Sequence, residues 1–146
     1  MAILFVCRGN MFRSQAAEAF FNQTYQKFGH PMSKFLVESC GTWVKKEDLE
    51  GRKLKSFPEL EQFLEVMKEK GIDISENVCK PIMPELVNWV DKIIVMAEKS
   101  ECPDYLLESS KVSFWDVENP NIGITKEHIK EVVEQIKELV LSLQYK

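Results

Sequence analysis

The stretch that decides the fold is Val6-Cys7-Arg8-Gly9-Asn10-Met11-Phe12-Arg13-Ser14. It follows an apolar run at residues 2–6 and precedes a helical pattern, so we interpret it as a short loop between a strand and a helix. The backbone N–H groups of such a loop, from Arg8 to Arg13, can point inward and bind an anion. The positive N-terminal end of the following helix favours the same anion.

Three side chains suggest what this loop could do. Cys7 stands at the mouth of the anion site, where a cysteine should exist largely as a thiolate. Arg13 is placed to reach back across the loop and bind two oxygens of an oxyanion. Ser14 can cap the following helix through its hydroxyl group. A thiolate beneath a bound phosphate is a nucleophile suited to phosphoryl transfer.

The loop resembles the C-x5-R-[ST] loop of protein tyrosine phosphatases. More narrowly, Phe5-Val6-Cys7-x-Gly9-Asn10-x-x-Arg13-Ser14 resembles the low-molecular-weight protein tyrosine phosphatase family, whose fold and loop the thioredoxin-coupled arsenate reductases share. The resemblance implies that Cys7 is the nucleophile, that Arg13 binds phosphate and that the Ser14 hydroxyl donates a hydrogen bond to the Cys7 thiolate. The other phosphate-binding positions would be Arg8, Gly9, Asn10, Met11 and Phe12.

A second segment, Ser39-Cys40-Gly41-Thr42-Trp43, resembles the Ser-Ala-Gly-Thr segment that follows the second strand in the same family. By this resemblance Ser39 helps to hold Asn10, which keeps the phosphate loop in a strained conformation. Trp43 would line the entrance and stack on an aromatic substrate, although a core or rim aromatic residue is an equally good interpretation. We interpret Cys40 as a small buried thiol.

The composition is that of an ordinary globular domain. The chain has 146 residues, 45% hydrophobic and 29% charged, so we expect one domain over residues 1–146. A net charge of −4 argues against a general nucleic-acid-binding protein. The apolar runs are too short to span a membrane, and residues 1–6 do not resemble a signal peptide. The four cysteines form no C-x-x-C pair and there is no His-rich cluster, so we expect no zinc site and a cytoplasmic, reducing setting. We also expect no metal or cofactor in the chemistry, because the anion-binding loop itself supplies positive charge.

Strand and helix patterns alternate along the chain. Apolar runs predict strands at residues 2–6, 35–39, 92–96 and 112–115. Helices are predicted over 15–28, from a capping box at Ser56-x-x-Glu59 to Gly71, over 84–90 and 101–107, and from Thr125 onward. We expect a turn at 29–34 and an exposed loop at 44–55. This alternation predicts an α/β fold: a four-stranded parallel sheet with helices on both faces and the phosphate-binding loop after the first strand. Ligands of such sheets bind beyond the carboxyl ends of the strands, where Cys7 lies.

A cysteine phosphatase also needs an acid to protonate the leaving group. In the resembled family this acid is an aspartate in an Asp-Pro pair after the fourth strand, and here the pair is Asn119-Pro120. Asparagine cannot donate a proton as a carboxylic acid does. The tyrosines that often follow the pair are replaced by residues 121–123, which weakens the case for phosphotyrosine as the substrate.

Three interpretations of this change remain open. Glu118 or Asp116 could present the acid, although a solvated surface carboxylate is the better interpretation of each one alone. The enzyme could instead act without a strong acid on substrates with good leaving groups. The loop could also bind an anion and turn over poorly.

The leading functional hypothesis is hydrolysis of a phosphomonoester, on a phosphorylated protein or a small molecule, through a cysteinyl-phosphate intermediate. The first alternative is arsenate reduction, which would need two further cysteines, and thioredoxin as a partner. In the related reductases these cysteines follow the third strand. Cys102-Pro103 matches the second of them, but Ala97 occupies the first position and Cys79 lies before that strand. The second alternative is a module that binds a phosphorylated partner without turnover.

Overall fold

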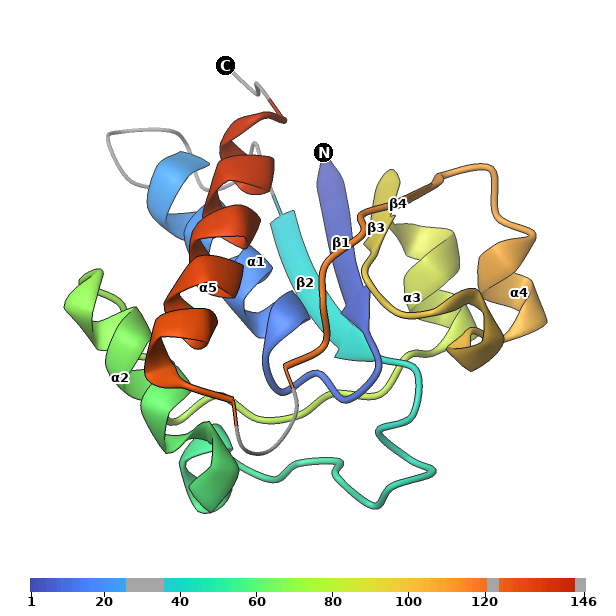
Figure 1. Cartoon of the computed structure of the whole chain (residues 1–146). Coiled ribbons are helices and arrows are strands. Elements are labelled where there is room, and N and C mark those ends of the chain that lie inside the picture. Colours follow the sequence, from blue (N-terminus) through green and yellow to red (C-terminus); the bar gives the residue numbers. More distant parts are fainter. Residues whose placement is uncertain (26–35, 121–123, 144–146) are drawn as a thin grey trace.

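A sheet of four parallel strands forms the centre of this computed structural model, which describes residues 1–25, 36–120 and 124–143 (Figure 1). The strands are β1 (Ala2–Cys7), β2 (Leu36–Gly41), β3 (Lys92–Val95) and β4 (Val112–Phe114), in the order β2-β1-β3-β4. β1 pairs in parallel with β2 and β3, and β3 pairs in parallel with β4. The predicted four-stranded parallel sheet is confirmed.

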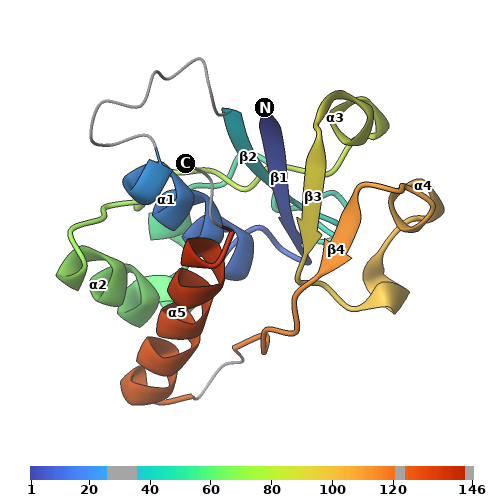
Figure 2. The ribbon, with the colours of Figure 1, turned by 90° about the horizontal axis from the view of Figure 1, so that it is seen from above.

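Helices cover both faces of the sheet, as predicted (Figure 2). On one face lie α1 (Arg13–Tyr25), α2 (Glu61–Glu69) and α5 (Lys126–Leu141). On the other lie α3 (Pro84–Trp89) and α4 (Asp104–Leu107). The apolar stripe of α5 is buried against α1 and α2, and Thr125 caps this helix by accepting a hydrogen bond from the His128 N–H group.

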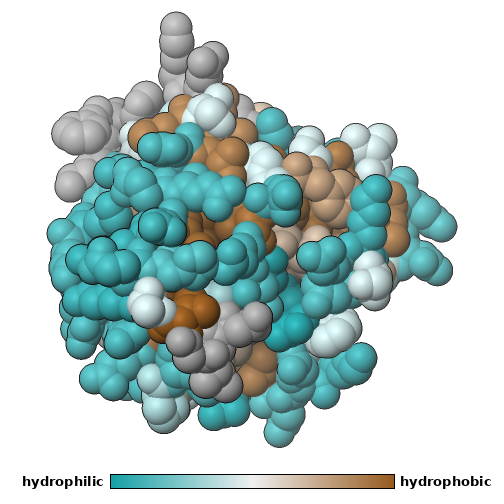
Figure 3. Space-filling view, in the orientation of Figure 1, coloured by the Kyte–Doolittle hydropathy of each residue, from teal (hydrophilic) through white to brown (hydrophobic). Residues whose placement is uncertain are grey.

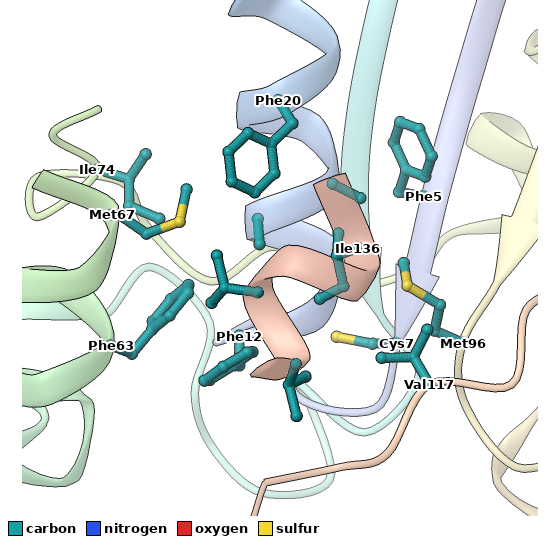
Figure 4. Packing of buried hydrophobic residues seen from close by; sticks show 14 of the residues in the cluster. Phe5, Cys7, Phe12, Phe20, Phe63, Met67, Ile74, Met96, Val117 and Ile136 are labelled. Carbon is teal, nitrogen blue, oxygen red and sulfur yellow. The ribbon is translucent and has the colours of Figure 1, made fainter. Parts of the chain in front are cut away.

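Side chains of β1 alternate between two hydrophobic cores, because neighbouring residues of a strand point to opposite faces. Ile3, Phe5 and Cys7 belong to the core beneath α1, α2 and α5. The even-numbered residues 2, 4 and 6 belong to the core beneath α3 and α4. Cys7 therefore ends the strand on the face that α1 and α5 cover, and its side chain lies among the apolar residues of that core (Figure 4).

Two predicted helix starts differ from the structure. α1 begins at Arg13, so Ser14 lies in its first turn and is not the N-cap residue. The Ser56-x-x-Glu59 capping box is also absent. The 3-10 turn Pro58–Leu60 precedes α2, which begins at Glu61, and the Ser56 hydroxyl donates instead to the Lys53 carbonyl. Pro58 starts a tight turn at this point and thereby delays the helix.

The segment at residues 44–55 is a largely exposed loop, as predicted, but it is held at three buried positions. Val44, Leu49 and Leu54 are buried in the main core, and the 3-10 turn Leu54–Ser56 closes the segment. Its charged residues lie around these three anchors. The predicted helix at 101–107 is similarly divided into the 3-10 turn Lys99–Glu101 and α4. The predicted turn at 29–34 and residues 121–123 lie outside the described residues.

The face seen in Figure 3 is mainly hydrophilic, with apolar side chains at the surface in small areas. Within the described ranges, no helix is long and apolar enough to cross a membrane. The same ranges contain no group of three or more His, Cys, Asp or Glu side chains that could hold a metal ion.

Candidate active site

The buried polar residues gather at one end of the sheet. Asn10, Arg13, Ser14 and Gln15 lie between the end of β1 and the first turn of α1, and Ser39 lies on the neighbouring strand β2. Burying polar groups is costly unless each of them has a partner. The hydrogen bonds of these residues therefore show what holds the loop.

Asn10 is the centre of this hydrogen-bond network. Its backbone has a φ of 53°, a left-handed conformation that costs energy for a residue other than glycine. Its side-chain Nδ2 donates to Ser14 Oγ at 2.8 Å and to Ser39 Oγ at 3.0 Å. Its Oδ1 accepts from Gln15 Nε2 at 3.1 Å and from the Lys80 backbone N–H group at 2.8 Å. Both donors and both acceptor positions of the amide are used, so the side chain fixes the strained backbone.

The segment after β2 holds the loop from the other side. The Thr42 backbone N–H group donates to the Cys7 carbonyl at 2.9 Å. Gly41 allows this close approach, because a Cβ atom at that position would lie 2.7 Å from the Arg8 carbonyl oxygen and 2.8 Å from the Asn10 nitrogen. The two segments that resemble the family in sequence are therefore packed backbone to backbone.

Cys7 and Ser14 meet inside the loop. The Cys7 Sγ lies 2.9 Å from the Ser14 Oγ, and both residues are buried. Since Ser14 Oγ also accepts from Asn10, its own proton is available to the sulfur. The structure thus brings together the pair that the resemblance implies.

Arg13 is a buried cation without a carboxylate partner among the described residues. Only 4% of it is exposed, and its Nη1 donates to the Met96 carbonyl oxygen and, at 3.2 Å, to the Val117 carbonyl oxygen. Backbone carbonyls orient the guanidinium group but do not neutralise it. Because an uncompensated buried charge is costly, the side chain favours an anion in the adjacent pocket.

Cys7 and Arg13 line a pocket of about 1110 Å³. This volume is far larger than a phosphate group needs, and much of the wall is apolar. From the loop the pocket takes residues 7–9 and 11–13, and from the rest of the chain Glu47, Leu49, Arg52, Phe57, Pro58, Glu59, Leu60, Glu61, Gln62, Phe63, Asn119, Pro120, Ile124 and Ile129. The loop after β1 thus lies at one side of a cavity with room for a group much larger than a phosphate.

Arg8 lies at the rim and is paired with acidic residues. Its guanidinium nitrogens lie 3.8 Å from Glu47 Oε1 and 3.5 Å from Glu101 Oε2. The same guanidinium carbon is 5.3 Å from the centroid of the Trp43 ring, and Lys46 Nζ lies 4.1 Å from that centroid. Trp43 is absent from the pocket lining, and two cations cover its ring, so its position is that of a rim aromatic residue.

The three candidate residues after β4 are not equivalent. Asn119 is half-buried and lines the pocket. Asp116 and Glu118 are exposed and do not line it. The Glu118 carboxylate is instead bonded to His128 Nε2, and this contact raises the pKa of the histidine. The structure therefore directs the amide, and neither neighbouring carboxylate, toward the pocket.

Sequence reasoning missed the carboxylates that do line the pocket, Glu47, Glu59 and Glu61. Glu59 and Glu61 flank the start of α2, and Glu47 lies on the segment expected to be an exposed loop. Arg52, also missed, lines the same cavity with its guanidinium carbon 4.3 Å from the Phe57 ring centroid. The buried apolar residues between these charges, Leu49 and Leu54, follow neither a helix nor a strand period, so the sequence carried no clear signal for this placement.

The remaining cysteines are buried or half-buried free thiols. Burial raises the pKa of Cys79 to about 11 and that of Cys102 to about 11, and it raises the pKa of Cys40 as well. The Cys102 thiol donates to the Glu98 carbonyl at 3.3 Å. Thiols with raised pKa values are poor nucleophiles for disulfide exchange at neutral pH.

The chain is similar to known proteins over most of its length. The family model for low molecular weight phosphotyrosine protein phosphatases matches residues 2–145. A probable low molecular weight protein-tyrosine-phosphatase, EpsP of Ralstonia solanacearum, is 35% identical over 101 residues, which make up 68% of this chain but only 59% of that protein.

Two solved structures extend the comparison. The low molecular weight protein tyrosine phosphatase of T. tengcongensis is 29% identical, with a TM-score of 0.73 over 98% of this chain and 97% of that one. A thioredoxin-dependent arsenate reductase of Corynebacterium glutamicum is 25% identical, with a TM-score of 0.67 over 97% of this chain and 59% of that one.

Proposed function

The chain belongs to the low molecular weight phosphotyrosine protein phosphatase family, and from this premise we propose that it hydrolyses phosphomonoesters through a phosphate bound covalently to Cys7. The observation that carries the proposal is the joint placement of Cys7 and Arg13 in one pocket, with Ser14 at 2.9 Å from the sulfur. The substrate would be a phosphorylated protein or a small phosphomonoester.

In the first step the Cys7 thiolate attacks phosphorus. A sulfur–phosphorus bond forms while the bond from phosphorus to the leaving oxygen breaks, and that oxygen departs with the electron pair. Negative charge then lies on the three equatorial oxygens. Arg13, which is buried and held by backbone carbonyls, would stabilise this charge together with the N–H groups of the loop.

In the second step water hydrolyses the cysteinyl phosphate. The oxygen of water bonds to phosphorus and releases one proton to the solvent, the sulfur–phosphorus bond breaks, and Cys7 leaves as a thiolate. The hydroxyl group of Ser14 can donate to that thiolate, which makes Cys7 a better leaving group. Neither step needs a metal ion or a cofactor, because the loop and Arg13 supply the positive field.

Protonation of the leaving group is the step in which this chain differs from the family. Asn119 faces the pocket where the family has its aspartate, and Asp116 and Glu118 are exposed outside it. We therefore propose that turnover proceeds without an acid at the family position. Such an enzyme favours substrates whose leaving oxygen is stable as an anion, and it loses about 10²–10⁴-fold in rate on substrates that need a proton.

Arsenate reduction is the second candidate, because an arsenate reductase shares the fold and Cys102-Pro103 matches one cysteine position of that group. The raised pKa values of Cys79 and Cys102 weigh against a relay of disulfides. A binding module without turnover is supported only by Asn119.

Hydrolysis of para-nitrophenyl phosphate across a range of pH tests the proposal, since its leaving group needs little help from an acid. Turnover that disappears in Cys7→Ser is the expected result. A wild-type protein that binds phosphate and shows no turnover would overturn the proposal, and reduction of arsenate with a thioredoxin system would then be measured.

A further inference from the structure

A hydrogen-bonded circuit continues beyond Asn10, away from the pocket. Ser39 Oγ, which accepts from Asn10, donates its own proton to Glu18 Oε1 at 2.6 Å. Lys80 Nζ lies 3.5 Å from the same Glu18 oxygen. The backbone N–H group of Lys80 donates to Asn10 Oδ1 at 2.8 Å. These contacts therefore form a closed path that starts and ends at Asn10.

Each donor in this circuit has a fixed direction. A backbone N–H group can only donate, so Lys80 fixes which end of the Asn10 amide is the oxygen. The amide nitrogen must then face Ser39 and Ser14 and donate to both. Ser39 has a single proton, and the Glu18 carboxylate accepts it. The Ser14 proton is left for the sulfur of Cys7.

We propose that Glu18 is a positioning residue: with Lys80 it closes the circuit that orients Asn10 and, through Ser14, the nucleophilic sulfur of Cys7. The inference rests on the proposed function, which makes Cys7 the nucleophile. Glu18 does not touch the pocket that holds Cys7, and it acts through Ser39 and Asn10.

Glu18 has the properties that such a residue needs. It is largely buried on α1, one helical turn after Ser14 and Gln15, and burial raises its pKa above the ordinary value, although Lys80 and the hydrogen bond from Ser39 partly offset this rise. A hydrogen bond that involves a carboxylate is about twice as strong as one between neutral groups. Since Ser39 is itself fully buried, its hydroxyl group is held by these two partners, Asn10 and Glu18.

The charged surroundings of Glu18 provide a control. Lys80 Nζ also lies 3.2 Å from Glu38 Oε2, so two carboxylates share one ammonium group. Only Glu18 is bonded to Ser39. Two other titratable groups lie near Glu18: the Cys40 thiol of β2 and the Glu76 carboxylate. Glu18 and Glu76 both line a small cavity of about 280 Å³.

The test measures the rate at which iodoacetamide alkylates Cys7, as a function of pH, with the modified peptide identified by mass spectrometry. This reagent is uncharged and reports on the thiolate itself, so the readout needs no phosphatase activity. Glu18→Met and Glu38→Met remove the same charge beside the same ammonium group, and only Glu18→Met removes the contact with Ser39. Glu18→Asp keeps the charge and draws the carboxylate away from Ser39.

Below neutral pH, we expect Cys7 to be alkylated about 3–10-fold more slowly in Glu18→Met than in Glu38→Met. This factor corresponds to the free energy that a single hydrogen bond contributes. The reactivity profile of Cys7 in Glu18→Met should move to higher pH. Loss of negative charge beside Lys80 would alone act in the opposite direction, by favouring the thiolate. Glu18→Asp should react more slowly than the wild type by a similar factor, and it serves if Glu18→Met fails to fold.

Two results would overturn the inference: equal profiles for Glu18→Met and Glu38→Met, or a wild-type profile for a folded Glu18→Asp. Hydrolysis of para-nitrophenyl phosphate is measured on the same proteins. Absent turnover with a Glu18-dependent alkylation profile would count against the proposed function alone. Normal turnover with an unchanged profile would count against the role of Glu18 alone.

Discussion

The loop between β1 and α1 and the segment between β4 and α5 both reach the same pocket, and they are built in opposite ways. In the loop, Asn10 and Arg13 are buried and bonded to fixed partners. In the segment, Asp116 and Glu118 are exposed, and the residue that faces the pocket is the amide Asn119. Under the proposed function, the residues for phosphate binding and nucleophilic attack are therefore held by fixed partners, whereas the residue at the position of the acid is an amide that cannot protonate the leaving group.

The largest expected effect is on the loop side. Arg13→Lys should lower kcat/KM for para-nitrophenyl phosphate by about 10²–10³-fold, because a lysine cannot bind two phosphate oxygens in the same plane. The matched control is Arg8→Lys, since Arg8 is already paired with rim carboxylates. A change of less than about 3-fold is expected there. Equal losses in both variants would mean that the two arginines bind phosphate alike.

On the segment side we expect a gain. Asn119→Asp should raise kcat for phenyl phosphate by about 10²-fold, because it restores a carboxylic acid that faces the pocket. It should change kcat for para-nitrophenyl phosphate little, since that leaving group needs no proton. Glu118→Gln is the control and should leave both rates unchanged. If Glu118→Gln instead flattens the pH profile of the wild type, Glu118 supplies the proton after all.

Packing behind the loop contributes to the stability of the fold. The Phe12 ring stacks on the Phe63 ring of α2, with centroids 4.0 Å apart and an interplanar angle of 21°. Phe63→Leu should lower the free energy of unfolding by about 1–2 kcal/mol through the lost stacking and packing. Trp89→Leu, at a side chain that is 54% exposed, should change it by less than about 0.5 kcal/mol. Urea denaturation measures both, and equal losses would show that the stack contributes nothing specific.

The smallest effect concerns the exposed pair of Glu118 and His128. Because Glu118 raises the pKa of His128 in the folded state, the pair stabilises the protein below the unfolded pKa of about 6.5. That stabilisation is lost as pH rises through the folded pKa. The Tm of His128→Gln should therefore lie slightly below that of the wild type at pH 6 and match it at pH 9. A difference of equal size at both pH values would contradict this assignment.

The sequence allowed the loop side to be predicted because its signal is local. An apolar strand, a loop of fixed spacing and a helical pattern stand next to one another in residues 2–25, and the structure has β1 and α1 there. The partners of Asn10 were only partly predictable. Ser39 followed from the resemblance, but Gln15 and the backbone of Lys80 join Asn10 only through the folded chain.

The prediction for residues 44–55 was incomplete, because the loop is largely exposed as expected but its buried residues were not predicted. Residues 44–55 contain so many charged side chains that Val44, Leu49 and Leu54 gave no recognisable period, although all three anchor the segment in the core. Asp116 and Glu118 are exposed, as the interpretation of each one as a solvated surface carboxylate expects, whereas the placement of Asn119 at the pocket was not predicted. Adjacent residues of an irregular segment point in different directions, and here the exposed Glu118 carboxylate is bonded to His128 of α5.

Because side chains alternate along β1, the face of the sheet toward which Cys7 points depends on whether its position in the strand is odd or even. Odd-numbered residues of the strand face α1 and α5, and even-numbered residues face α3 and α4. Inserting or deleting one residue between positions 2 and 6, with the pairing to β2 and β3 preserved upstream, would turn Cys7 toward the wrong core. Inserting or deleting two residues would return Cys7 to its original face but would lengthen or shorten the strand. The length of this strand is therefore constrained far more tightly than its apolar composition.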